Sequence, residues 1–68
     1  MSRPRFFSVP ATVADTLVNR DLRRHWTENG EVRVLLSTSD LYAYGVDRAL
    51  SDGAVELSLE QVKSLPNQ

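Results

Sequence analysis

Cysteine is absent from this 68-residue sequence, and histidine and tryptophan occur once each. Without cysteine there is no disulfide framework, no thiolate metal site and no cysteine nucleophile. A single histidine without cysteine also excludes the common zinc sites. The longest apolar runs, such as Val34-Leu35-Leu36, are far shorter than the roughly 20 residues of a membrane-spanning helix. These absences predict a small globular protein with neither a disulfide nor a metal to stabilise it.

A composition of 41% hydrophobic and 25% charged residues is typical of one small globular domain over residues 1–68. A core of this size seldom supplies more than about 3–5 kcal/mol of stability. Residues 1–5 are expected to form a flexible basic arm. The apolar stretch that follows, Phe6-Phe7-Ser8-Val9, is too short for the apolar region of a signal peptide, so we expect a cytoplasmic protein.

The net charge of −1 is unevenly distributed along the chain. Residues 1–33 carry six bases and four acids (+2), whereas residues 34–68 carry two bases and five acids (−3). Seven of the eight bases are arginine, which suits phosphate or carboxylate contacts but also reflects genomic base composition. A pI near 5.7 argues against a protein that coats nucleic acid indiscriminately.

The N-terminal half predicts a short edge strand at Phe6–Val9 and then a helix from Pro10 to about Trp26. Proline suits the first position of a helix, and Thr12 with Asp15 fits a capping pattern. The apolar stripe of this helix is Val13, Ala14, Leu17, Val18, Leu22 and Trp26. The opposite face holds Thr16, Asn19, Arg20, Arg23 and Arg24, which is the pattern of an amphipathic helix. Gly30 is expected to end the helix with a left-handed exit.

The C-terminal half predicts mainly strands. The alternation in Glu31–Ser37 indicates a strand with one apolar face. Residues 41–50 fit either a strand or a helix capped by Thr38 or Ser39; we favour the strand because Gly45 costs a helix about 1 kcal/mol. Ser51-Asp52-Gly53 is then a hairpin turn leading into a strand at residues 54–57.

The last segment also leaves two alternatives. Residues 58–61 suit a single helical turn capped by Ser58, followed by a final short strand from Val62 to Leu65 that Pro66 ends. The second alternative is one helix from Ser58 through Leu65, with its apolar residues on one face.

Together these elements predict an α+β fold, in which one N-terminal amphipathic helix packs on a small, strongly bent antiparallel sheet or SH3-like barrel. The alternative is a three-helix α/β fold with a short sheet. The run Val32-Arg33-Val34-Leu35-Leu36, the segment around Gly45, and the closing Leu59 to Pro66 resemble SH3-like or Sm-like small β-barrels over residues 31–66. The resemblance implies a barrel, and because such barrels host unrelated functions it implies no particular activity.

Catalytic and cofactor chemistry is not predicted. His25 has no Ser/His/Asp signature near it, and a general base needs an orienting partner and a nucleophile within reach. The nine carboxylates form no paired-acid motif that predicts a metal site or glycosidase chemistry. The three glycines are too far apart to hold a phosphate. We therefore expect a protein that is not an enzyme and binds no cofactor or metal.

A protein partner, or a second copy of the chain, is the leading hypothesis. Five aromatic residues in a thin core leave some of them for an exposed apolar patch, which marks association sites. Tryptophan and arginine are also enriched at binding hot spots. The predicted partner-binding residues are Arg20, Arg23, Arg24, Trp26, Tyr42 and Tyr44. For Trp26, a place in the core where the helix meets the sheet is an equal alternative.

Nucleic acid is the alternative ligand. Arginines on the helix and on the N-terminal arm are able to meet phosphates, and exposed aromatic side chains stack on bases. The residues of this alternative are Arg3, Arg5, Arg20, Arg23 and Arg24. The sequence thus predicts a small cytoplasmic regulator or adaptor that contacts protein, with a nucleic-acid-binding barrel or a structural subunit of a larger assembly as alternatives.

Overall fold

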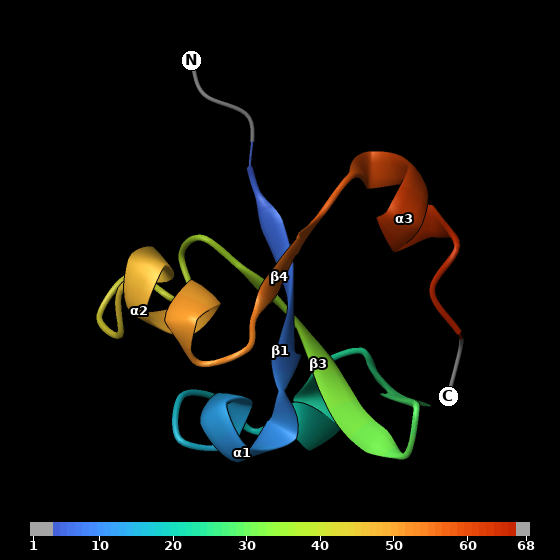
Figure 1. Ribbon diagram of the computed structural model, residues 1–68, viewed down its shortest axis with the longest axis horizontal. Helices are drawn as coiled ribbons and strands as arrows, with labels where there is room; N and C mark the ends of the chain where they lie inside the picture. The colour runs from blue at the N-terminus through green and yellow to red at the C-terminus, as the bar shows by residue number, and fades with distance from the viewer. Residues whose placement is uncertain (1–3, 67–68) are drawn as a thin grey trace.

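Four antiparallel strands form one open sheet in the order β2-β3-β1-β4, seen in a computed structural model that describes residues 4–66 (Figure 1). The strands are β1 (Phe6–Pro10), β2 (His25–Glu28), β3 (Glu31–Ser37) and β4 (Val55–Leu57). The helices are α1 (Ala11–Ala14), α2 (Val46–Ser51) and α3 (Leu59–Lys63), with a 3₁₀ turn η1 (Arg20–Leu22). The predicted α+β class and antiparallel sheet are confirmed, while β1 lies inside the sheet and not at its edge.

The pleat of β1 decides which neighbour each of its residues contacts. Thr38 donates its backbone N–H to the carbonyl of Arg5 at 3.1 Å, and the register pairs Phe7 with Leu36 and Val9 with Val34. Hydrogen-bonded and non-bonded pairs alternate along an antiparallel ladder. Phe7 and Val9 therefore form their backbone bonds with β3, and Phe6 and Ser8 point their backbone groups toward β4.

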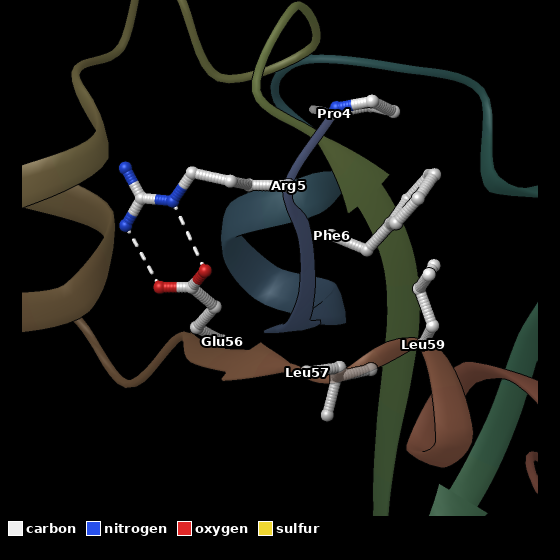
Figure 2. A pocket seen from close by; sticks show the side chains of 6 residues that line it. All are labelled: Pro4, Arg5, Phe6, Glu56, Leu57 and Leu59. Atoms are coloured by element: carbon white, nitrogen blue, oxygen red, sulfur yellow. Dashed lines mark hydrogen bonds and ion pairs between the residues drawn. The ribbon is translucent and has the colours of Figure 1, made fainter. Parts of the chain in front are cut away.

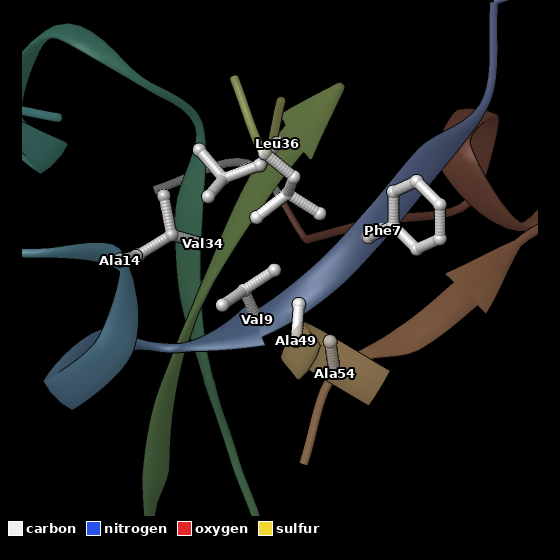
Figure 3. Close-up of a cluster of buried hydrophobic side chains, with 8 residues drawn as sticks. Phe7, Val9, Ala14, Val34, Leu36, Ala49 and Ala54 are labelled. Atoms are coloured by element: carbon white, nitrogen blue, oxygen red, sulfur yellow. The ribbon is translucent and has the colours of Figure 1, made fainter. Parts of the chain in front are cut away.

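The main core lies on one face of the sheet. Phe7 and Val9 on β1 share this face with Val34 and Leu36 on β3, and all four are fully buried. Figure 3 shows how α1, α2 and the α2–β4 connection cover them with small residues, which are Ala14, Ala49 and Ala54 respectively. Each fully buried side chain of this size contributes about 1.5–3 kcal/mol of transfer free energy. The alternation of apolar residues in β1 and β3 thus accounts for this layer.

The predicted N-terminal helix is wrong beyond its first turn. Helix α1 ends at Ala14, and the chain continues through turns and η1 into β2, which contains Trp26. Asn29 and Gly30 have positive φ angles of 52° and 78°, the conformation of a tight two-residue hairpin turn. This turn pairs Trp26 with Arg33 across the hairpin. The β2–β3 pairing overrides the helical period, and Gly30 is a hairpin residue, not the end of a helix.

The favoured strand at residues 41–50 is also wrong. The chain turns after β3, buries Leu41 completely, and enters α2 after Gly45, whose φ is 101°. The Asp40 carboxylate accepts the backbone N–H of Ser37 at 2.9 Å, which closes the turn and prevents β3 from continuing. The helical alternative agrees with the structure only over residues 46–50, because α2 begins after Gly45 and is not capped by Thr38 or Ser39. Ser51-Asp52-Gly53 ends this helix where we expected a hairpin turn.

The structure of the last described residues agrees better with the prediction from the sequence. The strand at Val55–Leu57 and the cap at Ser58 are confirmed. The Ser58 hydroxyl accepts the Gln61 N–H at 3.1 Å, and the Gln61 side chain accepts the Ser58 N–H at 2.8 Å. This reciprocal capping box starts α3. The final strand at Val62–Leu65 is wrong, since Val62 lies within the helix.

Candidate functional site

The three arginines expected on one helix face lie in different local structures. Arg20 is in η1, with its Nε 3.6 Å from the Asp15 carboxylate. Arg23 follows η1, with its Nη1 2.6 Å from the carboxylate of Asp40. Arg24 directly precedes β2 and turns to the end of α3. The predicted arginine face does not exist, because the helix that was to carry it is absent.

Arg24 holds α3 against the sheet. Its Nη2 donates to the carbonyl of Leu65 at 2.6 Å, and its other nitrogens lie 3.4 Å from the Pro66 carbonyl and 3.5 Å from the Val62 carbonyl. The last carbonyls of a helix have no partners within the helix, and a cation there also meets the negative end of the helix dipole. Arg24 is therefore a structural residue that positions α3.

Asp40 joins Arg23 to the turn after β3. Its carboxylate also accepts the backbone N–H of Ser37 at 2.9 Å and its hydroxyl at 3.1 Å. Burial by itself raises the pKa of Asp40, but the hydrogen bonds from Arg23 and Ser37 outweigh burial and lower that pKa below its ordinary value. This carboxylate is thus held charged, in a structural role.

Trp26 is 1% exposed and belongs to the sheet. Its indole Nε1 donates to the Glu28 carboxylate at 3.3 Å. Trp26 is the register partner of Arg33, and Arg33 is the register partner of Pro10. Because successive residues of a strand alternate between the two faces, all three lie on the face opposite to the main core that contains Val9. The burial of Trp26 agrees with the alternative of a core position, but Trp26 lies in β2 on the face away from the main core and not where a helix meets the sheet. Its ring offers almost no surface to a partner.

Tyr42 and Tyr44 lie in the turns before α2. Tyr42 is 86% exposed. Tyr44 packs against the main core on the sheet face away from Trp26, and its hydroxyl donates to Asp52. The hydrogen bond to Asp52 raises the pKa of Tyr44, and the Arg48 guanidinium lies 4.4 Å from the centre of the ring. Trp26 and the two tyrosines therefore do not form one aromatic patch.

The remaining residues that the sequence singled out also lie apart from one another. Arg3 lies outside the described residues. Arg5 makes a bidentate pair with Glu56, with Nε–Oε2 and Nη2–Oε1 distances of 3.0 and 2.8 Å. This hydrogen-bonded pairing raises the pKa of Arg5 and lowers the pKa of Glu56. The Nδ1 atom of His25 lies 3.1 Å from the Arg23 carbonyl.

A surface that the sequence analysis missed lies where β4 meets α3. Val55 and Leu59 are each 54% exposed, and Phe6 and Leu57 beside them are partly exposed. Phe6 and Leu57 are register partners, and Val55 lies on the same sheet face two residues from Leu57. We call Phe6, Val55, Leu57 and Leu59 the β4–α3 apolar surface.

Two hollows meet at Leu57 on this surface. The first, of about 340 Å³, is lined by Phe6, Leu57 and Leu59, with the Arg5–Glu56 pair at its rim (Figure 2). In Figure 2, Phe6 and Leu59 lie on the opposite side of β1 from the charged pair. The second hollow, of about 280 Å³, lies between the sheet and α3 and is lined by Val55, Leu57, Trp26, Arg33 and Leu65, among others.

A third hollow, of about 390 Å³, lies beside α1 and has a more polar lining that includes Asp15 and Arg20. A signal for the β4–α3 apolar surface was present in the alternation Val55-Glu56-Leu57-Ser58-Leu59. Recognising it required the position of β4 at the edge of the sheet, which is set by long-range pairing with β1.

Over residues 4–66, no group of three or more histidine, cysteine, aspartate or glutamate side chains is placed to hold a metal ion. The described helices include none long and apolar enough to cross a membrane. Comparisons with protein-family models, with curated proteins and with solved structures find no match to this chain. The resemblance of residues 31–66 to small barrels stays a prediction.

Proposed function

We propose that this chain is a non-enzymatic binding module, a small regulator or adaptor that contacts another protein through the β4–α3 apolar surface. One observation carries the proposal: Val55 and Leu59, on successive elements, are each 54% exposed beside the partly exposed Phe6 and Leu57. Exposed apolar residues that gather in one place, with a charged rim, mark interaction sites. Arg5 and Glu56, which line the same hollow as Phe6, Leu57 and Leu59, supply charged groups beside the apolar residues.

The partner proposed is a protein and not a nucleic acid. The nucleic-acid alternative needs arginines free to meet phosphates. Arg5, Arg20 and Arg23 instead lie against the carboxylates of Glu56, Asp15 and Asp40, and Arg24 binds carbonyls at the end of α3. These contacts favour a surface whose binding energy comes from apolar contact.

The layout of the two sheet faces also supports a partner. One face is closed by α1 and α2, whereas, within residues 4–66, the β4–α3 end of the other face is covered by the five-residue α3. A protein that buries this surface adds apolar burial worth roughly 25 cal/mol per Å² before the costs of association. Partner binding stabilises a thin core by mass action.

The test combines Val55→Asp with Leu59→Asp and uses Leu22→Asp as the matched control. Leu22 is 79% exposed but lies in η1. Tagged proteins are used to isolate partners from extract of the source cells, and each partner is identified, purified and titrated. We expect the double variant to bind at least about 100-fold more weakly, because a charge in a buried apolar contact is costly, while the control binds normally.

Circular dichroism and thermal unfolding check that both variants remain folded. Equal binding by the double variant and the control overturns the site. If the wild-type chain binds no protein while its affinity for nucleic acid is high, the protein-partner proposal itself is overturned.

A further inference from the structure

The outer edge of β4 presents one backbone pair to solvent. Arg5, Phe7 and Val9 direct their backbone groups to β3, so Phe6 and Ser8 form the bonds to β4, through their partners Leu57 and Val55. The pair Phe7–Glu56 is then a non-hydrogen-bonded pair. The N–H and C=O of Glu56 therefore point away from the sheet, on a strand that has no neighbouring strand on that side in the part of the chain that the structure describes.

Three of the neighbouring backbone groups already have partners within the chain. The Ala54 N–H donates to the Ala49 carbonyl at 2.9 Å, and the Ser58 N–H donates to the Gln61 side chain at 2.8 Å. The Ser58 carbonyl accepts the Val62 N–H at 3.0 Å. In an antiparallel ladder one residue exchanges both bonds with the residue opposite. A single antiparallel partner residue therefore satisfies both groups of Glu56.

Such a partner strand places its side chains in a defined way. The residue opposite Glu56 directs its side chain to the Glu56 face of the sheet, and its two neighbours direct theirs to the other face. Those neighbours lie opposite Leu57 and Val55, next to the two hollows of about 340 and 280 Å³ that meet at Leu57. The edge therefore fits an extended segment with apolar side chains on both sides of its central residue.

The charge of Glu56 determines which kind of side chain is favoured at the central residue of the partner strand. The Glu56 carboxylate accepts two hydrogen bonds from Arg5 and is about half exposed. Because opposite charges directly across a strand pair stabilise it, a carboxylate at this position favours a basic side chain opposite Glu56. A second copy of β4 would place Glu56 opposite Glu56, and like charges directly opposite each other destabilise a strand pair.

We propose that β4 binds an extended segment of a partner protein, with the pattern apolar–basic–apolar, as an antiparallel fifth strand. The basic residue exchanges two backbone hydrogen bonds with Glu56 and extends toward its carboxylate, and the flanking apolar side chains contact the β4–α3 apolar surface. This inference rests on the proposed function and specifies how the partner is recognised. Backbone pairing supplies affinity and the alternate side chains supply specificity, as in other strand-addition complexes.

The test titrates the full chain with the capped peptide Thr-Leu-Lys-Val-Thr and follows backbone amide signals by NMR. Two matched peptides carry glutamate in place of lysine, or an N-methyl group on the lysine amide. We expect the first peptide to shift the Glu56 amide signal and to protect it from exchange. Each matched peptide is expected to bind at least about tenfold more weakly.

Two protein variants complete the design. Glu56→Lys is expected to reverse the preference between the lysine and glutamate peptides, whereas Glu60→Lys on the exposed part of α3 leaves it unchanged. Equal binding of the N-methyl peptide overturns strand pairing, and equal binding of the glutamate peptide overturns the charge rule. Light scattering that shows a dimer dissociated by Val55→Asp assigns the edge to a second copy and also overturns the proposal.

The outcomes separate this inference from the proposed function. If purified partners bind wild type and lose affinity for the Val55→Asp/Leu59→Asp variant, while no peptide binds, the apolar surface stands and strand addition is wrong. If neither partners nor peptides bind, both are wrong.

Discussion

The structural role of Arg33 follows directly from a proline elsewhere in the sequence. Pro10 ends β1 and has no N–H, so it donates no hydrogen bond to Gly53 across the continued β1–β4 register. Arg33 supplies the missing donor: its Nη2 donates to the carbonyls of Gly53 and Ser8, both at 2.9 Å, and its Nε donates to the Ser8 hydroxyl at 2.7 Å. Within residues 4–66 no buried side-chain polar atom lacks a partner.

Replacing Arg33 by lysine tests this role. The lysine keeps the charge but does not reproduce the planar fork that spans Ser8 and Gly53. With buried groups left unpaired, we expect a loss of about 2–3 kcal/mol of stability, measured by urea unfolding. Arg48→Lys, at an exposed position, is the control. A loss for Arg33→Lys no larger than for the control contradicts the role.

Asp40 gives a pH dependence with a definite sign. Hydrogen bonds from Arg23 and Ser37 outweigh burial and lower the pKa of folded Asp40 below its ordinary value of 3.8. The folded state therefore binds fewer protons than the unfolded state. The Asp40 contribution is complete above the unfolded pKa and is lost as pH falls through the folded pKa.

In Asp40→Asn, we expect stability to fall less between pH 6 and pH 2 than in wild type, as followed by urea midpoints. Arg20→Gln, which leaves the Asp40 cluster intact, controls for the loss of a surface charge. If the stability of Asp40→Asn falls as much between pH 6 and pH 2 as that of wild type, the Asp40 carboxylate is not a source of this pH dependence.

At the scale of elements, local signals predicted some parts and long-range pairing decided others. The strand at Glu31–Ser37, the strand at Val55–Leu57 and the Ser58 cap are encoded by neighbouring residues and were predictable. The predicted helix ending near Trp26 is wrong because the β2–β3 hairpin, which turns at Asn29-Gly30, overrides the helical period of the apolar residues. That dipeptide between β-forming residues is a strong hairpin signal, and the sequence analysis assigned it to a helix end.

The candidate site was harder to predict than the fold for the same reason. Trp26 is 1% exposed and pairs with Arg33 across the hairpin, a pairing that the predicted helix from Pro10 to about Trp26 does not allow. Val55 and Leu59 are exposed because β4 lies at the edge of the sheet. Both facts depend on which strands become neighbours, and hydrophobic periodicity carries no information about that order.

Arg24 provides a prediction for a single element. Arg24→Ala removes the donors to the carbonyls at the end of α3, and hydrogen bonds to a charged group contribute about 1.5–3 kcal/mol each when buried. Because this contact is only partly buried, we expect a loss near 1 kcal/mol and faster amide exchange confined to α3. Exchange that rises equally in β1 and β3 contradicts a local role, and Arg20→Ala is the control.

At the scale of the whole molecule, folding brings together the two oppositely charged halves of the chain. Arg5 pairs with Glu56 and Arg23 with Asp40, so bases of the N-terminal half lie on acids of the C-terminal half. The exposed Arg5–Glu56 pair stabilises little, since such pairs contribute about 0–1 kcal/mol. These ion pairs instead affect which ligands the protein binds, because paired arginines are poor phosphate ligands.

We therefore expect no measurable affinity for mixed-sequence oligonucleotides, even at low salt, by fluorescence anisotropy. Affinity that falls steeply as salt rises contradicts this expectation, because it is the signature of phosphate contacts. The Arg23→Glu variant then shows whether that affinity depends on the N-terminal arginines.

The central claim is that the β4–α3 apolar surface contacts another protein. The most direct measurement places a photoreactive phenylalanine analogue at Leu59 or, as the control, at Leu22; both positions are exposed leucines, at 54% and 79%. After irradiation in cells, crosslinked products are resolved by mass spectrometry. We expect a defined protein adduct from position 59 and none from position 22. No adduct from position 59, or the same products from both positions, contradicts it.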